Sequence, residues 1–370
     1  MADKVAPKPG MGQPPEWFFP TTRYRGSKRK ILSWIWAALR DIPFETALDL
    51  FGGTGVVSLL FKRMGKQVTY NDYLRYNHIS AVALVENCNT QFTDEDLAFI
   101  LGNHASIRPG TFITDTFRKY YFLDSENKWL DRTIANISAL SLLYSGRQLR
   151  EKQALALWAL GQACLIKRPF NLFHRKNLSL RTRDVERGFG NKSTWETPFP
   201  MAMRRFVREA NQTVFDNGRK NKALCRDAFC VEQAGYDLVY LDPPYFFAHQ
   251  ENLDYRTSYH FLEGIAQYDK WPNLVDQSSY GLRLKRNGMQ WPAHSINELM
   301  GLYSLLLDRF RESIIVVSHK SGSLVPVGVI RQLLIERGKQ VQTRWRHYSY
   351  ALSKNNGKPR HNIEWLIVGS

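Results

Sequence analysis

The chain has 370 residues, of which 44% are hydrophobic, so it can bury a sizeable core in one large or two modest domains. Its 51 lysines and arginines against 34 aspartates and glutamates give a net charge of +17, which indicates a polyanionic partner such as nucleic acid. No apolar run approaches the ~18 residues of a membrane span and no signal peptide is visible, so neither a membrane protein nor a secreted protein is expected. Residues 1–17 are rich in proline and lack periodicity, which predicts a disordered arm.

The first predicted structured element is a basic segment in front of an amphipathic helix. The segment runs from Arg23 to Lys28 and reads RYRGSK. Apolar residues then recur at helical spacing and fall on one face: Ile31, Leu32, Ile35, Trp36 and Leu39. On its own, this pattern indicates only a basic loop that caps a surface helix.

A glycine-rich turn follows the next predicted strand. The stretch from Ala47 to Val57, ALDLFGGTGVV, predicts a strand, a turn and the start of a helix. Glycines at such a turn let the backbone and the helix N–H groups approach a bound nucleoside closely. The following strand, Gln67 to Tyr70, ends in Asn71 and Asp72, where a carboxylate can accept hydrogen bonds from ribose hydroxyls. The glycine spacing does not fit the GxGxxG of dinucleotide-binding proteins.

The pattern turns helical from about residue 96 to residue 224, with the clearest helices expected at Ile137–Tyr144 and Ala154–Leu165. The stretch from Lys167 to Arg226 holds 15 lysines and arginines against 5 aspartates and glutamates, with aromatic residues between them. The ordinary interpretation of such a charge run is a basic surface exposed to solvent. A long segment between two halves of one sheet is typical of an inserted domain. We predict a catalytic domain at 18–95 and 225–370 and an inserted DNA-recognition domain at 96–224.

The strand Asp237–Leu241 runs directly into the tetrapeptide DPPY, which ends at Tyr245. Two prolines have fixed φ and no N–H, so they form a stiff ledge whose carbonyls remain free to accept hydrogen bonds. The two prolines are Pro243 and Pro244. We expect the amino group of a planar base to donate hydrogen bonds to the Asp242 carboxylate and the Pro243 carbonyl, which would aim the nitrogen lone pair at a methyl donor. Tyr245 would stack on the base, a contact worth ~1–3 kcal/mol. Alone, the tetrapeptide also fits a strand end followed by a turn.

These motifs, in this order, resemble the alpha-group (Dam-like) adenine-N6 DNA methyltransferases, and the ledge together with the glycine turn favours S-adenosylmethionine over NAD. The family has an RYxGSK-type segment, then FxGxG, then a recognition region, then DPPY. The resemblance implies that Tyr24 and Lys28 hold the adenine or methionine end of S-adenosylmethionine and that Asp72 takes its ribose. Four residues are implied to surround this cofactor: Phe51, Gly52, Gly53 and Gly55.

The resemblance extends through the second half of the chain. Asp227 stands where the family has an acidic residue that reads the amino group of the cofactor's adenine, although Ala228 separates it from Phe229. Tyr259 to Glu263 resembles the segment that closes over the flipped base. The resemblance therefore implies that Asp227 binds the cofactor and that Tyr259 to Glu263 covers the target base.

The C-terminal strands complete the predicted fold. Ser313 to Ser318 resembles the next core strand, and Arg344–Leu352 with Ile363–Val368 resembles the terminal antiparallel pair of methyltransferase sheets. The expected fold class is therefore α/β, with a doubly wound, Rossmann-like methyltransferase sheet and a mainly helical insertion.

A stretch within the insertion resembles the family's YNGLxRxN motif. It reads FNLFHRKN from Phe170, and Leu172 replaces the usual glycine. Asn171, Arg175 and Asn177 keep the family's spacing and are implied to contact DNA. We expect Arg175 to read a guanine through O6 and N7, with an ordinary phosphate contact as the alternative.

We therefore predict a site-specific DNA methyltransferase that flips an adenine out of the duplex and methylates its N6 amine. Double-stranded DNA is the expected partner, without a membrane or a metal, since the four cysteines show no zinc-ligand spacing: Cys88, Cys164, Cys225 and Cys230. The resemblance implies the cytoplasm of a prokaryotic cell or phage-infected host and leaves open a cognate restriction endonuclease.

Alternative functions remain at this point. Cytosine-N4 methylation uses a similar ledge that more often begins with serine. RNA or protein-glutamine methylation is a further alternative, although those families generally lack the RYxGSK segment and the basic insertion. A catalytically silent DNA-binding module is the alternative outside enzymes. None of the cysteines follows a proline, so the nucleophile of cytosine carbon-5 methyltransferases is missing.

Overall fold

The computed structural model describes residues 16–173, 176–183, 192–247, 254–285, 295–348, 354–355, 358–359 and 362–370. Its centre is a seven-stranded sheet with the strand order β3-β2-β1-β4-β5-β9-β6. The first five strands in the chain run parallel, and β9 is antiparallel to both β5 and β6. The strands are β1 (Thr46–Asp49), β2 (Gln67–Asn71), β3 (Lys222–Leu224), β4 (Leu238–Leu241), β5 (Ile314–Lys320), β6 (Val341–Tyr348) and β9 (Asn362–Gly369), with β7 (Lys354–Asn355) and β8 (Lys358–Pro359) paired separately. The predicted fold class is confirmed.

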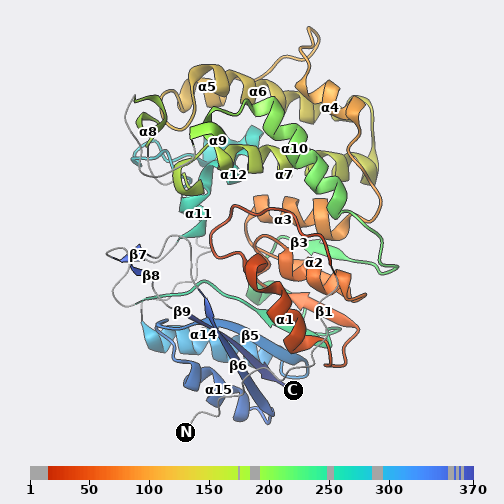
Figure 1. Cartoon of the computed structure of the whole chain (residues 1–370), viewed down its shortest axis with the longest axis vertical. Coiled ribbons are helices and arrows are strands. Elements are labelled where there is room, and N and C mark those ends of the chain that lie inside the picture. Colours follow the sequence, from red (N-terminus) through yellow and green to blue (C-terminus); the bar gives the residue numbers. More distant parts are fainter. Residues whose placement is uncertain are drawn as a thin grey trace.

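Helices cover both faces of the sheet (Figure 1). Alternate residues of β4 enter the two cores, Leu238 and Tyr240 on one side and Val239 and Leu241 on the other, because side chains alternate along a strand. Burial on both faces explains why β4 is a continuous apolar run. The helices around the sheet are η1 (Lys28–Ile31), α1 (Leu32–Leu39), α2 (Val56–Arg63), α3 (Arg75–Ala81), the π-helix η2 (Val82–Glu86), η5 (Ala228–Cys230), α14 (Ile296–Arg309) and α15 (Val327–Ile335).

A second layer, made of helices, lies beyond α3 at the top of Figure 1. Its ring-rich core includes Phe117, whose ring centroid lies 5.1 Å from that of Phe261 and 5.0 Å from that of Trp271. The elements are α4 (Asp94–Leu101), α5 (Phe112–Thr116), α6 (Asp124–Ser138), η3 (Ala139–Leu142), α7 (Gly146–Ile166), η4 (Pro169–Asn171), α8 (Ser179–Thr182), α9 (Lys192–Glu196), α10 (Phe199–Thr213), α11 (Tyr255–Ser258), α12 (His260–Ile265), η6 (Tyr268–Lys270) and α13 (Trp271–Leu274). Among the described residues, no helix is long and apolar enough to cross a membrane.

The predicted division of the chain into an arm, a catalytic domain and an insertion stays a prediction, and residues 1–15 of the arm lie outside the described part. Two features shift its boundaries. The sheet resumes at Lys222, three residues before the expected boundary at 225, because β3 pairs with β2. Moreover, α12 and α13 lie within the expected catalytic part but pack in the helical layer, where their aromatic side chains find apolar partners.

The two helices predicted within the insertion have different outcomes. Ala154–Leu165 lies inside α7, so that prediction is confirmed. Ile137–Tyr144 is not one helix, because α6 ends at Ser138 and only a 3-10 turn follows to Leu142. Ile137 and Leu140 are buried, but Leu142 and Leu143 are 73% and 53% exposed, so no buried apolar face continues the helix beyond Leu140.

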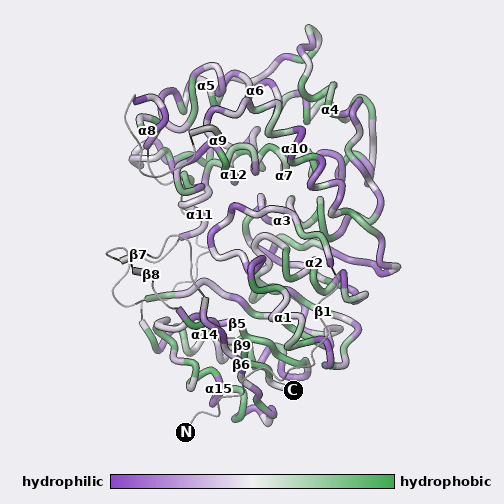
Figure 2. The backbone as a smooth tube through the Cα atoms, viewed as in Figure 1, coloured by the Kyte–Doolittle hydropathy of each residue, from purple (hydrophilic) through white to green (hydrophobic). Residues whose placement is uncertain are grey.

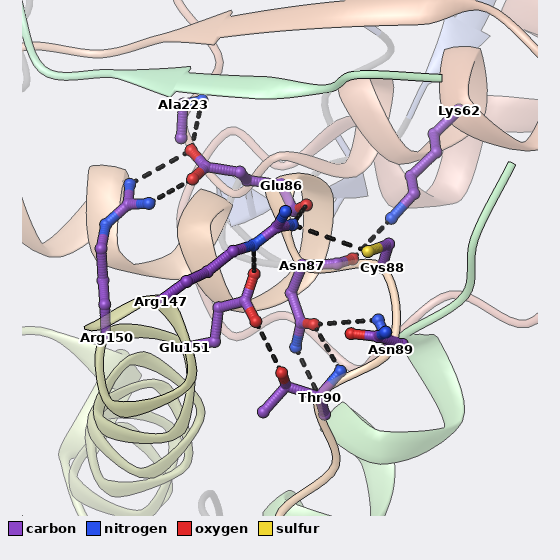
Figure 3. A network of polar contacts seen from close by, with 10 residues as sticks. All are labelled: Lys62, Glu86, Asn87, Cys88, Asn89, Thr90, Arg147, Arg150, Glu151 and Ala223. Carbon is purple, nitrogen blue, oxygen red and sulfur yellow. Dashed lines mark hydrogen bonds and ion pairs between the residues drawn. The ribbon is translucent and has the colours of Figure 1, made fainter. Parts of the chain in front are cut away.

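Charged side chains join the helical layer to the sheet (Figure 3). Glu86, the last residue of η2, accepts hydrogen bonds from both terminal nitrogens of Arg150 on α7 and from the backbone N–H of Ala223 on β3, the last at 2.9 Å. Arg147 and Glu151 of α7 form an ion pair of 2.7 Å beside it. One carboxylate thus links α7 to the edge strand. Figure 2 shows hydrophobic segments through α2 and the sheet, with hydrophilic segments recurring in the outer loops.

Candidate active site

The glycine turn and the DPPY segment leave the sheet side by side. They follow β1 and β4, which are adjacent and parallel, with Asp49 opposite Tyr240 in the register. The backbone N–H of Leu50 donates to the Tyr240 carbonyl at 3.1 Å, so the pairing continues to the point where both chains turn away. Ligands of open α/β sheets bind outside the carboxyl ends of the strands, at the place where the strand order reverses. In this sheet the order reverses between β1 and β4.

The glycine turn has a conformation that requires glycine at two positions. Gly53 and Gly55 have φ of +51° and +73°, and Gly55 is the N-cap of α2. Gly52 has a different constraint, since a Cβ there would lie 2.1 Å from the Tyr70 ring. Glycines are therefore needed for the backbone conformation of this turn and for its close contact with the Tyr70 ring.

Buried Asp49 fixes the start of α2. Its Oδ2 accepts hydrogen bonds from the N–H of Ser58 at 3.1 Å and from the Ser58 hydroxyl at 2.7 Å. Burial raises the pKa of Asp49 to about 7, while the bonds from Ser58 act in the opposite direction.

Asp72, at the end of β2, shapes the same turn. Its carboxylate accepts hydrogen bonds from the N–H of Gly53 at 2.9 Å, the N–H of Leu74 at 2.8 Å and the side-chain amide of Asn77 at 3.1 Å. The N–H of Tyr73 is a fourth donor to this carboxylate. A carboxylate has about four acceptor sites, so a ligand hydroxyl would replace one of these donors or share its oxygen. Burial raises the pKa of Asp72 to about 6 despite these donors.

The segment at Arg23–Lys28 lies against the glycine turn. The Ser27 hydroxyl caps η1 and contacts the Thr54 hydroxyl at 3.3 Å. The Tyr24 hydroxyl accepts from Asn77 at 3.2 Å, so Asn77 links Tyr24 to Asp72. This segment therefore reaches the turn from the N-terminal side, and the role of Tyr24 in cofactor binding stays a prediction.

Tyr24 is also stacked on two tyrosines of the segment after DPPY. Its ring centroid lies 4.1 Å from that of Tyr259 and 5.5 Å from that of Tyr255. The stretch from Tyr259 to Glu263, which was expected to close over a base, is buried throughout. Glu263 accepts from the N–H groups of Arg75 and Tyr76 at 2.8 and 2.9 Å and thereby fixes the start of α3. These side chains have structural contacts, and the predicted closure over a base stays a prediction.

The structure brings Lys28 to the DPPY segment. Its Nζ lies 2.8 Å from each carboxylate oxygen of Asp242 and 2.9 Å from the Tyr245 hydroxyl. The Tyr245 hydroxyl in turn donates to Asp242 Oδ1 at 2.6 Å. The expected role of Lys28 in cofactor binding stays a prediction, and the contacts described for its Nζ are with the ledge and with Glu364.

Glu364 of β9 completes this cluster. Its Oε1 lies 3.1 Å from Lys28 Nζ, 3.2 Å from the Tyr245 hydroxyl and 3.3 Å from the Ser318 hydroxyl. Glu364 is fully buried, whereas the Asp242 side chain is 17% exposed. Burial raises the pKa of Asp242, and Lys28 lowers it while Glu364 raises it further. We did not single out Glu364 from the sequence, although a lone carboxylate in the apolar run NIEWLIV was a usable signal.

Comparison with known proteins identifies the family. The model for the D12 class N6 adenine-specific DNA methyltransferases matches residues 24–273, which include the glycine turn and the DPPY segment. The chain belongs to this family. The methyltransferase is 32% identical over 233 residues to the Type II methyltransferase M2.HphI of Haemophilus parahaemolyticus, an alignment that covers 61% of the chain and 66% of the relative.

Two other relatives are similar over almost the whole methyltransferase. The Type II methyltransferase M.NlaIII of Neisseria lactamica is 22% identical over 363 residues, with 93% of the chain and 98% of the relative covered. The modification methylase LlaI of Lactococcus lactis subsp. lactis is 26% identical over 373 residues, with 93% and 54% covered.

Asp227 of the methyltransferase lies in a turn beside the sheet. It is half-buried and accepts a hydrogen bond from the N–H of Phe229 at 2.9 Å, which caps η5. Asn71 fixes this turn from β2, since its side chain bonds both the N–H and the carbonyl of Arg226 at 3.1 Å. The turn therefore follows β3 on the same edge of the sheet as Asp72.

Of the three residues expected to contact DNA, the structure describes Asn171 and Asn177, and both bond Arg168. Arg175 lies outside the described residues. Asn171 follows Phe170, and both have φ near +60°, at +57° and +60°. The Asn177 side-chain oxygen accepts from Arg168, a fully buried guanidinium that also donates to the Leu172 carbonyl at 3.2 Å. Asn177 was expected to contact DNA, but its oxygen is used within the fold.

Some cations of the basic stretch form ion pairs inside the protein. Lys167 and Arg181 are buried and both contact Glu126, at 2.8 and 2.9 Å. By contrast, α10 has a buried apolar face and carries Arg204, Arg205 and Arg208 on its exposed side. Sequence alone did not separate these two groups of cations. In the part of the chain that the structure describes, no three His, Cys, Asp or Glu residues form a group that could hold a metal ion.

Proposed function

We propose that this methyltransferase transfers a methyl group from S-adenosylmethionine to the N6 amine of an adenine that is flipped out of duplex DNA. One observation carries the proposal: adjacent parallel strands bring the glycine turn and Asp242 to the same edge, and Asp242 is the more exposed carboxylate of a largely buried cluster. The order of the motifs from Arg23 to Tyr245 supports membership of the alpha, Dam-like group.

The residues around the glycine turn fit a nucleoside cofactor. When bound, S-adenosylmethionine supplies an electrophilic methyl group on a sulfonium sulfur. Gly53 and Gly55 leave the turn without side chains in a conformation that L-residues rarely adopt, so a ligand can approach the backbone. Asp72 would accept from the ribose hydroxyls in place of one of its present donors, and Asp227 would read the adenine. Tyr24 and Phe51 would form apolar walls.

The ledge would bind the target base. Flipping an adenine costs a few kcal/mol, which contacts in the pocket offset. Asp242 and the Pro243 carbonyl would accept hydrogen bonds from the amino group, and Tyr245, held by the cluster after Pro244, would contact the base. No strong base is required, because the nitrogen loses its proton after it has become cationic. Positioning therefore carries most of the catalysis.

The assay that tests this proposal is product analysis. Purified protein is incubated with mixed-sequence duplex DNA and S-adenosylmethionine, and the DNA is digested to nucleosides for mass spectrometry. We expect N6-methyladenine, and sequencing of the methylated DNA gives the target site. Formation of N4-methylcytosine, or of methylated RNA in a parallel reaction, would overturn the assignment.

A restriction endonuclease of the same specificity is the functional partner that we propose. Relatives with the printed names Type II methyltransferase and modification methylase support it. DNA that this enzyme has methylated should resist that nuclease, while unmethylated DNA is cut.

Replacing Asp72 should weaken cofactor binding in a pH-dependent way. At pH 8 the carboxylate is ionised, and Asp72→Asn should weaken S-adenosylmethionine binding by ~1–3 kcal/mol through loss of charge-assisted hydrogen bonds. Because the pKa of Asp72 is raised to about 6, the wild-type affinity should fall as the pH drops through 6, and the difference from the variant should shrink. Titration calorimetry at pH 5 and pH 8 measures both. An equal deficit at both pH values would place the effect elsewhere.

Two arginines of the basic stretch should affect DNA binding differently. Arg175→Ala should cost ~1–3 kcal/mol on the cognate site and relax discrimination at one base position, if its guanidinium reads a guanine. Arg204→Ala, on the exposed face of α10, should weaken cognate and random duplexes alike. Fluorescence anisotropy with both duplexes separates the two effects. A uniform loss for Arg175→Ala would make it a phosphate contact.

A further inference from the structure

We propose that Glu364 is a positioning residue for methyl transfer. Glu364 acts as a second counterion of Lys28. The Asp242 carboxylate can therefore accept a hydrogen bond from the amino group of the target base. The inference rests on the proposed role of Asp242 and adds to it a residue from the far end of the chain.

The side chains of the cluster differ in their exposure to solvent. The side chains of Lys28 and Glu364 are 6% and 0% exposed, while that of Asp242 is 17% exposed. Asp242 is therefore the carboxylate that a substrate can reach, and Glu364 lies behind it on β9. Pairing of β9 with β5 fixes this arrangement, since Lys320 is opposite Glu364 in the register and Ser318 contacts Glu364 from the same strand.

The hydrogen bonds of the cluster show how Glu364 acts. The Lys28 ammonium has three protons and faces oxygens of Asp242, Tyr245 and Glu364 within 3.1 Å. The Tyr245 hydroxyl has one proton and lies 2.6 Å from Asp242 and 3.2 Å from Glu364. When the base binds, Asp242 must release part of this donor set to accept from the amino group. Glu364 then remains as the counterion of Lys28 and as an acceptor for Tyr245.

The charge balance favours the same role. Without Glu364, the Lys28 ammonium would be paired with Asp242 alone, and this pair would present no net charge to the reacting nitrogen. During transfer, the N6 lone pair forms the new N–C bond while the methyl carbon leaves its sulfur, which keeps the bonding electron pair. The nitrogen becomes cationic and then releases one proton to Asp242. The second carboxylate gives the three hydrogen-bonded groups Lys28, Asp242 and Glu364 one excess negative charge, which stabilises this cation.

The titratable groups around Glu364 come from four elements. Lys28 lies on η1, and Asp242 and Tyr245 lie after β4. On the neighbouring strands, His319 lies beside Ser318 on β5, and Lys320 of β5 and Arg346 of β6 are opposite Glu364 in the register. Burial lowers the pKa of His319, which keeps its ring neutral in the working pH range. Glu364 raises the pKa of Asp242, so its removal should move the titration of Asp242 to lower pH.

A double-mutant cycle on the full-length protein tests the proposal. Glu364→Gln keeps the shape and removes the charge, and we expect single-turnover methylation to slow by about 10- to 100-fold at pH 8. Dissociation constants for S-adenosylmethionine and DNA should change less than about threefold, and the acid limb of the pH profile should move to lower pH. Lys28→Met should be slow as well, because two carboxylates are left without their cation.

The double variant is the deciding measurement. If Glu364 acts through the charge of Lys28, Glu364→Gln in the Lys28→Met background should restore part of the activity. Additive losses, or an acid limb that does not move, would reduce Glu364 to a structural role and overturn the proposal. The double variant keeps the net charge of the wild-type cluster, and its remaining carboxylate is the more exposed Asp242, so it reports even if one single variant folds poorly. Wild-type protein that makes no N6-methyladenine would instead refute the proposed function.

Discussion

Asp242→Ala should lower the rate of methyl transfer by at least ~10²–10³, the usual cost of losing one oriented hydrogen bond to a reacting group. The carboxylate is the reachable member of the ledge cluster, and its removal leaves the base amine without its acceptor. Lys28 still has Glu364 as a counterion at 3.1 Å, so the variant should fold. Rapid-quench single-turnover assays with radiolabelled S-adenosylmethionine measure the rate.

DNA binding and cofactor binding should change little in Asp242→Ala, since the residue has no part in the phosphate contacts or the glycine turn. A matched control is Asp237→Ala at the opposite end of β4, whose carboxylate accepts from the N–H groups of Glu45 and Thr46 at 2.8 and 2.9 Å. That variant should lose stability but keep its rate. Full activity of Asp242→Ala would refute the ledge as the site of chemistry.

Gly52→Ala should be the most damaging single methyl group that can be added to the cofactor turn. The new Cβ would lie 2.1 Å from the Tyr70 ring, which is fully buried and whose hydroxyl donates to the Gly53 carbonyl at 2.8 Å. Neither the Gly52 backbone nor the Tyr70 ring can shift without moving the turn. We expect a destabilisation of ~1–3 kcal/mol from overpacking, and at least a tenfold loss of S-adenosylmethionine affinity as the turn moves.

Calorimetry and thermal unfolding measure both effects of Gly52→Ala. The control is Gly328→Ala on α15, where a Cβ meets nothing within 4 Å and helix propensity predicts a gain of up to ~1 kcal/mol. The double variant Gly52→Ala/Tyr70→Leu should recover part of the cofactor affinity. If Gly52→Ala binds the cofactor normally, the turn does not contact it.

The fold was largely predictable because its signals are local. The apolar run of β4 and the glycine turn after β1 are short patterns whose meaning does not depend on distant residues. The course of Ile137–Tyr144 was not predictable in the same way, since spacing favours a helix but the exposure of Leu142 and Leu143 depends on packing. Likewise, α12 joins the helical layer through aromatic contacts that no local pattern specifies.

The candidate site was predictable only in part. Motifs identified Asp242 and the glycines, but they say nothing about which side chains meet across more than 200 residues. Lys28 contacts a ledge that is 214 residues away along the chain, and Glu364 contacts both from β9, which lies between β5 and β6. In the recognition stretch, Arg168 and Asn177 bond each other, an arrangement that similarity to a motif does not reveal.

The shared contact of Lys167 and Arg181 with Glu126 bears on how strongly this protein responds to ionic strength. A protein that neutralises phosphates releases the counterions condensed on the duplex, and the salt dependence of its affinity counts only cations that reach the backbone. Lys167, Arg168 and Arg181 are occupied inside the fold and release none. The formal charge of +17 therefore overstates the number of ions exchanged on binding, and the enzyme should tolerate added salt better than its composition implies.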